Sequence, residues 1–98
     1  MNKKIHTEAT DQLFDAILSL KNRKECYSFF EDICTVNELY SLAQRFDVRI
    51  RLMNKNTYQE ISAATGASTV TISRVNRLLF DDNQGLEMAA ARISERKE

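Results

Sequence analysis

Residues 68–77 combine short hydroxyl side chains, three apolar side chains and two guanidinium groups at helical spacing. Ile72, Val75 and Leu79 fall at i, i+3 and i+7, which predicts a buried stripe along one side of a helix. The opposite side carries Thr69, Val70, Ser73, Arg74 and Arg77. Asp and Glu are absent from residues 61–80. Hydroxyl groups bond either class of base, arginine bonds guanine or phosphate, and valine methyls fit against thymine methyls. This face therefore predicts contact with the major groove of duplex DNA.

A shorter helix is expected just before this stretch. Thr57 and Glu60 have the spacing of a capping box, in which each side chain bonds the backbone N–H of the other residue. The helix that follows, residues 58–64, has Ile61 and Ala64 as its inward positions.

A tight turn at residues 65–67 is expected to join the two helices. Gly66 takes a positive φ at little cost, and Ser68 is a favourable N-cap for the second helix. Two helices joined by a short turn that contains glycine form a helix-turn-helix unit. The sequence thus predicts a helix-turn-helix over residues 57–80.

The N-terminal part of the second helix of such a unit usually meets the bases. The base-edge candidates are Ser68, Thr69, Val70 and Ser73. Phosphate or flanking contacts are expected from Gln59, Ser62 and Thr71, and base or phosphate contacts from Arg74 and Arg77. Further phosphate contacts are expected from Arg49, Arg51 and Lys55.

The charge of the chain is distributed unevenly, although its net value is zero. Residues 45–77 carry six Lys and Arg against two Asp and Glu, a net charge of +4. Residues 1–44 carry five against seven and residues 78–98 three against five, a net charge of −2 in each case. Positive charge is concentrated around the helix-turn-helix, as phosphate contact requires. The alternative is an ordinary solvated helix face.

The remainder of the chain predicts an all-α fold. Proline is absent and only two glycines occur, which favours long helices joined by short turns. The spacing of apolar residues predicts further helices over residues 7–20, 23–33, 36–53 and 84–96. Asn22 is expected to cap the second of these, and Thr35 with Glu38 to form a capping box on the third. We expect one domain over residues 1–98.

The helix over residues 36–53 is apolar on several sides, with Leu39, Phe46 and Ile50 spread around it. Such a helix is usually central, and in a chain this short a partner subunit is a natural source of the covering surface.

Several classes of protein are disfavoured. His6 is the only histidine, and Cys26 and Cys34 lack metal-ligand spacing, so we expect neither a metal site nor an enzyme. Both cysteines are expected to be free and buried. No apolar run has the length of a membrane span or of a signal peptide, so we expect a cytoplasmic protein with no membrane partner.

Two segments resemble the Trp repressor family. Gln59-Glu60-Ile61 with residues 65–74 resembles its helix-turn-helix, and residues 35–38 with 45–50 resemble its long central helix. The sequence is more similar still to the YerC/YecD group of Trp-repressor-related proteins, over residues 10–95. The resemblance implies a six-helix subunit in an intertwined homodimer that acts as a transcription regulator, a repressor. Its two helix-turn-helix units would read successive major grooves about 34 Å apart.

The resemblance also implies a site for an effector. In that family tryptophan lies between the central helix and the helix-turn-helix, held by a threonine and two arginines. The matching positions here are Thr35, Arg45 and Arg74, if one residue is missing from the connection over 53–56. Val75 and Leu78 replace a glycine and a serine of that pocket, and a branched side chain fills the space an indole needs. We expect no cofactor, with L-tryptophan or another small effector as the alternative. Without an effector, Thr35 is only a cap, Arg45 only a surface or dimer charge, and Arg74 only a DNA contact.

A second class of function is a helical protein-interaction or assembly module that does not bind DNA. Such a surface would be rich in Leu, Phe or Tyr, whereas this one is rich in Ser, Thr and Arg.

Overall fold

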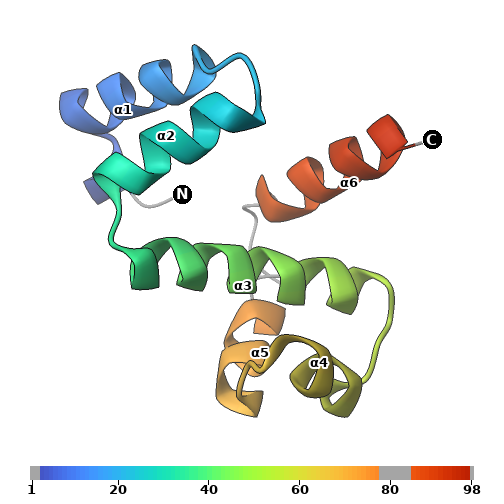
Figure 1. The fold of residues 1–98 in the computed structure, drawn as a ribbon. Coiled ribbons are helices and arrows are strands. Elements are labelled where there is room, and N and C mark those ends of the chain that lie inside the picture. Colours follow the sequence, from blue (N-terminus) through green and yellow to red (C-terminus); the bar gives the residue numbers. More distant parts are fainter. Residues whose placement is uncertain (1–2, 78–84, 98) are drawn as a thin grey trace. The chain divides into compact units, whose positions relative to one another are not determined.

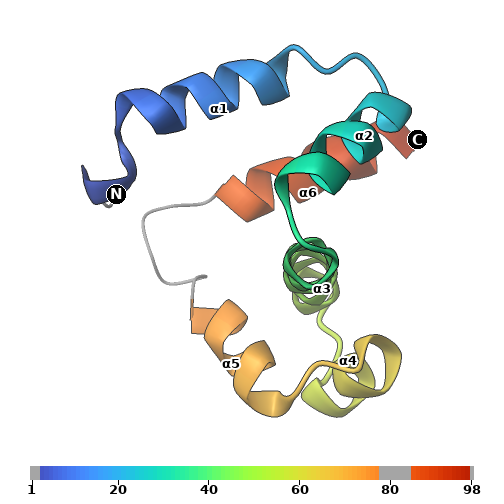
Figure 2. The same ribbon diagram turned by 60° about the vertical axis from the view of Figure 1, so that its left-hand side comes forward.

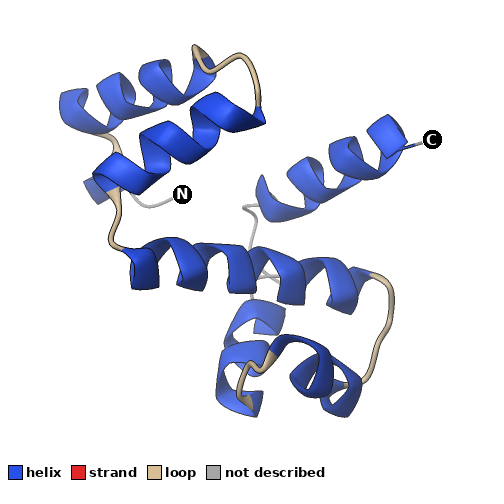
Figure 3. Ribbon diagram, in the orientation of Figure 1, coloured by secondary structure: helices blue, strands red, loops and turns tan. Residues whose placement is uncertain are grey.

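The computed structural model describes residues 3–77 and 85–97 of the chain, and every regular element in these ranges is helical (Figures 1 and 3). The elements are η1 Lys3–Ile5, α1 Glu8–Leu18, α2 Arg23–Ile33, α3 Val36–Met53, α4 Tyr58–Thr65, α5 Thr69–Arg77 and α6 Gly85–Lys97. The all-α prediction is confirmed. The bounds expected for the second and third helices agree with those of α2 and α3.

The first helix is shorter than the expected range of residues 7–20. Thr7 is the N-cap of α1, and its side-chain oxygen accepts a hydrogen bond from the Thr10 N–H over 3.1 Å. At the other end, the Ser19 hydroxyl donates to the Ala16 carbonyl over 2.6 Å. The Thr7 contact satisfies a backbone N–H that the start of the helix leaves without a partner, so α1 begins at Glu8. The Ser19 contact does the same for a carbonyl near the other end, where α1 ends at Leu18.

The contacts divide the chain into two compact units, residues 1–39 and 40–98. The first unit contains η1, α1, α2 and the start of α3, and residues 19–22 join α1 to α2 (Figure 2). Asn22 caps α2 as expected, by accepting from the Glu25 N–H over 2.9 Å. Phe29 and Phe30 meet edge to face, with their ring centroids 5.3 Å apart. No residue of α1 or α2 is buried.

The two cysteines differ from expectation in their burial. Cys26 and Cys34 are free, as expected, but both are only half-buried. The reason is that the helices of this unit do not bury any residue between them, so its apolar side chains remain partly in contact with solvent.

The second unit is built around the C-terminal part of α3. The pair α4 and α5 lies on one side of this helix and α6 on the other (Figures 1 and 2). The core of this unit lies between α3, α4 and α5. Its buried residues are Val48, Ile61, Ala67, Ile72 and Val75, and Leu52 and Tyr58 pack against them. Burying this apolar surface fixes the two short helices on α3.

One inward position of α4 was predicted wrongly. Ala64 is exposed, and Ala67 takes a place in the core instead. The inward side of α4 is formed by Tyr58, Ile61 and Thr65, which are at least half-buried and spaced at i, i+3 and i+7. Ala64 lies beside this stripe and is therefore exposed. Leu79, expected to continue the stripe of Ile72 and Val75, lies outside the described residues, as do Leu78, Phe80 and Gln84.

Candidate nucleic-acid interface

The first helix of the helix-turn-helix begins at a complete capping box. The Thr57 hydroxyl accepts from the Glu60 N–H over 3.1 Å, and the Glu60 carboxylate accepts from the Thr57 N–H over 2.8 Å. The hydrogen bond from the Thr57 backbone, and then that from its side chain, lower the pKa of Glu60 below its ordinary value. The predicted start of α4 is confirmed in detail.

The turn after α4 depends on two adjacent residues. Gly66 has φ +75°, the left-handed conformation, and its N–H donates to the Ser62 carbonyl over 2.9 Å. A Cβ at this position would meet no atom within 4 Å, so the requirement for glycine is one of backbone conformation. The Thr65 hydroxyl donates to the Ile61 carbonyl over 2.7 Å and accepts from the Ala67 N–H over 3.1 Å. This directs Ala67, 2% exposed, into the core.

Ser68 caps the second helix. Its hydroxyl accepts from the Thr71 N–H and donates to the Thr71 hydroxyl, each over 3.1 Å. The start of α5 is therefore held by side chains that remain accessible: Ser68 is exposed and Thr71 half-buried.

Two hydrogen bonds from outside the turn hold the unit in place. The Gln44 side chain on α3 donates to the Thr65 carbonyl over 3.2 Å, at the end of α4. The Asn76 side chain on α5 donates to the Tyr58 hydroxyl over 3.0 Å, at the start of α4. The two helices are thus joined to each other and to α3 by directional contacts as well as by the apolar core.

The predicted DNA-binding residues lie on α4 and α5 as follows. On α5, Thr69, Arg74 and Arg77 are exposed, Val70 is 62% exposed and Ser73 is half-buried. On α4, Gln59 is exposed and Ser62 half-buried. None of the predicted residues is buried, whereas Ile72 and Val75 on the other side of α5 are 0% and 4% exposed.

The accessible cations of residues 45–77 fall into two groups. Arg45 and Lys55 are exposed, like Arg74 and Arg77, and no carboxylate partner for these four occurs among residues 3–77 and 85–97. Arg51 pairs with Asp47 over 3.1 Å, one turn earlier on α3.

Arg49 does not fit its expected role as a phosphate contact. It is 1% exposed and pairs with Glu87 on α6. The sequence placed this charge in the positive segment, but it lies on the inner side of α3 next to the core residue Val48, so it is not accessible to DNA.

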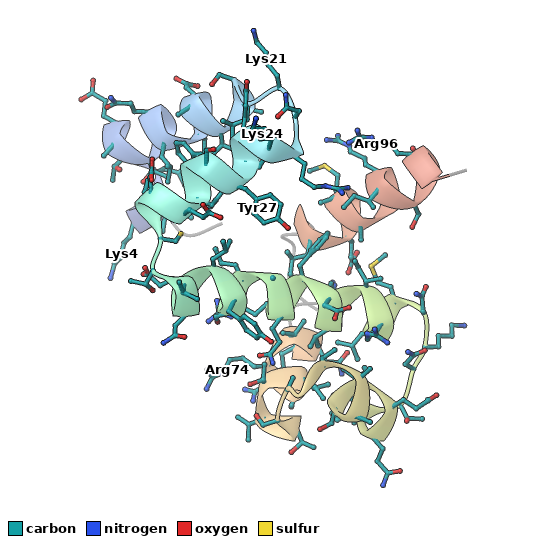
Figure 4. All side chains as sticks on the ribbon, viewed as in Figure 1. Lys4, Lys21, Lys24, Tyr27, Arg74 and Arg96 are labelled. Atoms are coloured by element: carbon teal, nitrogen blue, oxygen red, sulfur yellow. The ribbon has the colours of Figure 1, made fainter. Side chains whose placement is uncertain are left out.

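A cleft of about 300 Å³ lies between α3 and α5. Arg45 and Arg74, two of the three predicted effector-binding residues, line it together with Ser41, Gln44, Thr71 and Val75. Figure 4 shows Arg74 projecting from α5. Two guanidinium groups at one cleft favour a carboxylate or another anion as its ligand. Val75 is almost fully buried and forms part of the wall of this cleft.

Thr35, the third predicted effector residue, belongs to the first unit, where it caps α3. Its hydroxyl accepts from the Glu38 N–H over 3.0 Å, and the Glu38 carboxylate accepts from the Thr35 N–H over 2.8 Å. The hydrogen bond from the Thr35 backbone, and then that from its side chain, lower the pKa of Glu38 below its ordinary value. The capping role predicted for Thr35 is confirmed, while its role toward an effector stays a prediction.

Three residues that position this surface carried no sequence signal of their role. Gln44 and Asn76 are polar residues on helices whose partners lie 21 and 18 residues away along the chain. Arg49 was indistinguishable from its neighbours Arg45 and Arg51, since its distinctive environment comes from Glu87, 38 residues later. No helix in the described ranges is long and apolar enough to span a membrane.

The comparisons with known proteins agree with this architecture. Residues 8–94 match the Trp repressor protein family, and the chain belongs to that family. It is 53% identical to the uncharacterized protein YerC of Bacillus subtilis (strain 168) over 92 residues, which cover 94% of this chain and 88% of YerC. The solved structure of a TrpR-like protein from Eubacterium eligens is similar with a TM-score of 0.90 at 53% identity, covering 95% of this chain and 96% of that one. A structure from Staphylococcus aureus has a TM-score of 0.91 at 48% identity, covering 96% of this chain and 95% of that one.

Proposed function

We propose that this protein is a sequence-specific DNA-binding transcription regulator that acts as a homodimer and represses its target genes. The observation that carries the proposal is the composition of the exposed side of α5, which offers hydroxyl, methyl and guanidinium groups and no carboxylate. Membership of the Trp repressor family, a family of regulators, supports the same reading.

The contacts of α5 with its surroundings suit a helix that enters a groove. Specific recognition requires that the side chains reading the bases be held by a rigid scaffold. The core residues Ile61 and Ile72, both 0% exposed, and the bond from Asn76 to Tyr58 supply that scaffold. Val70 exposes an apolar side chain to solvent in the first turn of α5, where contact with a thymine methyl would cover it.

The homodimer is supported by the apolar surface of the first unit and of the start of α3. Large apolar side chains are exposed there: Leu18 82%, Tyr27 58%, Ile33 53%, Val36 83% and Tyr40 71%. Exposed apolar residues that recur over neighbouring helices favour a covering protein surface. We expect sedimentation equilibrium to show a dimer at micromolar concentration. A monomer that binds DNA as tightly as the dimeric protein would contradict this part of the proposal.

Substitution of Arg74 tests the DNA-binding surface. The probe is a duplex oligonucleotide selected by the wild-type protein from a random pool. Arg74→Ala is expected to lower affinity for this duplex by about 10-fold or more, because one guanidinium contact to a base or phosphate contributes about 1–3 kcal/mol. Arg23→Ala is the matched control, since it removes an equal charge at an exposed arginine of α2, outside the helix-turn-helix. Equal binding by the Arg74→Ala variant and the wild type would remove Arg74 from the interface.

Repression is tested separately. The selected duplex is placed across the promoter of a reporter gene in a host that expresses the full chain. We expect reporter expression to fall because a dimer bound there excludes the polymerase, and a rise would identify an activator instead.

For the cleft between α3 and α5 we propose that no cofactor is required for DNA binding. Val75 reduces the room for an indole ring, although Arg45 and Arg74 would attract a small carboxylate. Titration calorimetry with L-tryptophan at millimolar concentration is expected to show no heat of binding. A measurable heat that disappears in the Arg45→Ala variant would make tryptophan the effector.

A further inference from the structure

Arg49 is a buried cation on α3 that contacts two other helices, α5 and α6. Its side chain is 2% exposed, and it starts from α3 next to the core residue Val48. One terminal nitrogen, Nη1, donates to the Val75 carbonyl on α5 over 3.3 Å. The other, Nη2, donates to the carboxylate of Glu87 in the first turn of α6. The Nε atom has no hydrogen-bond partner among the described residues.

Burying this ion pair in the interior of a small unit has a cost in free energy. A buried ion pair is weak evidence for stability, because the cost of removing two charges from water can exceed their attraction, and an apolar replacement is often as stable. Leaving Nε without a partner adds to that cost. Unlike an apolar side chain, an arginine makes directional hydrogen bonds. Its planar guanidinium therefore fixes the relative positions of two acceptors.

The two acceptors belong to elements that matter for recognition. Val75 lies in the last described turn of α5, one residue after the exposed Arg74. Glu87 lies near the start of α6, on the other side of α3 (Figure 1). If α6 moves away, Arg49 keeps a buried charge without its carboxylate, and its bond to the Val75 carbonyl is disturbed as well. The position of α5 therefore depends on the packing of α6.

We propose that Arg49 and Glu87 are positioning residues for DNA recognition: they fix the orientation of α5 on α3 through the Val75 carbonyl and make it conditional on the packing of α6. This inference rests on the proposed function for its DNA-binding consequence. It does not place either residue in contact with DNA, because Arg49 is 1% exposed.

The Arg49→Lys variant tests the inference at constant net charge. A lysine carries one nitrogen and cannot present the same two-pronged geometry to the Val75 carbonyl and to Glu87. The control is Arg23→Lys, the same change at an exposed arginine of α2 outside the helix-turn-helix. Affinity is measured for the duplex selected by the wild-type protein, and hydrogen exchange is measured for the amides of α2, α5 and α6 in the free protein.

We expect Arg49→Lys to lower affinity for the selected duplex about tenfold, the loss caused by misplacing roughly one base contact. The Arg23→Lys control should leave this affinity unchanged. Amide exchange should become faster in α5 and α6 and stay unchanged in α2. Unchanged affinity and unchanged exchange in α5 would overturn the inference. So would exchange that accelerates equally in all three helices, because that pattern reports a loss of global stability only.

A second variant keeps the test decisive if Arg49→Lys does not fold. The double substitution Arg49→Met with Glu87→Leu removes both charges together and so leaves no buried charge unpaired. It should unfold at a temperature close to that of the wild type and still show faster exchange in α5 and weaker DNA binding. Wild-type affinity and exchange in this variant would overturn the inference. If the wild type selects no duplex at all, the proposed function fails, and the exchange measurements alone still decide whether Arg49 positions α5.

Discussion

The side-chain amide of Asn76 donates a hydrogen bond to the Tyr58 hydroxyl over 3.0 Å and so joins the end of α5 to the beginning of α4. The bond is partly buried and lies beside the core of the second unit, against which Tyr58 packs. It fixes the angle between the two helices of the helix-turn-helix at the side away from the Gly66 turn.

Tyr58→Phe is therefore expected to destabilise the protein by about 1 kcal/mol, because the partly buried Asn76 amide loses its partner while the ring remains. Thermal unfolding followed by circular dichroism measures the change. Tyr40→Phe is the matched control, since Tyr40 is 71% exposed and its hydroxyl has no hydrogen-bond partner among the described residues. Equal midpoints for Tyr58→Phe and the wild type would show that the bond does not contribute to stability.

The capping boxes predict a dependence of stability on pH. Hydrogen bonds from Thr57 lower the pKa of Glu60 below its ordinary value of 4.5, and those from Thr35 do the same for Glu38. A carboxyl group whose pKa is lower in the folded state stabilises the protein above its ordinary pKa. This contribution is lost as the pH falls through the lowered value, where the folded state also takes up the proton.

The Glu60→Gln variant isolates this contribution, because glutamine preserves the capping box but does not titrate. At pH 7 the wild type should have the larger free energy of unfolding in urea, and the difference should shrink as the pH is lowered below 4.5. A difference that stays constant between pH 7 and the acid range would show that the Glu60 carboxylate is not stabilised in the folded protein.

Lys55 is placed where glycine is favoured. It has φ +63°, and the bonds from its N–H to the Leu52 carbonyl and from the Asn56 N–H to the Arg51 carbonyl form a Schellman motif at the end of α3. We expect Lys55→Gly to stabilise the protein by about 1 kcal/mol, because glycine adopts this conformation without steric cost. The same variant should bind the selected duplex more weakly and with a smaller dependence on salt, since one exposed cation is lost.

Lys55→Ala separates the two effects. It removes the charge and leaves a side chain at positive φ, so it should weaken DNA binding without the gain in stability. Greater stability in Lys55→Ala than in Lys55→Gly would refute the conformational argument, and unchanged DNA binding in both variants would remove Lys55 from the interface.

The parts of this structure that the sequence predicted best are those set by neighbouring residues. The Thr57–Glu60 capping box, the left-handed Gly66 and the Ser68 cap all form between residues no more than four positions apart. Such contacts are independent of the rest of the fold, so residue type and spacing are enough to predict them.

The errors arose where distant parts of the chain meet. Ala64 was expected in the core because it fits a helical stripe with Ile61, but α4 is too short for the stripe to be defined by spacing alone. Arg49 was expected to contact phosphate because it belongs to the positively charged segment 45–77, but it is buried with Glu87, which is far along the chain. Burial and long-range pairing depend on how helices pack, which the local pattern does not contain.

Selection of bound duplexes from a random oligonucleotide pool by the wild-type protein tests the central claim most directly. A homodimer that reads DNA with α5 should enrich a site with two-fold symmetry, whose half-sites are centred about one helical turn, or a multiple of it, apart. The same selection with Arg74→Ala should enrich that site much less strongly, in line with its expected loss of affinity. If the folded wild-type protein enriches no sequence, or if both proteins enrich the same one equally, the assignment of α5 as the DNA-reading helix is wrong.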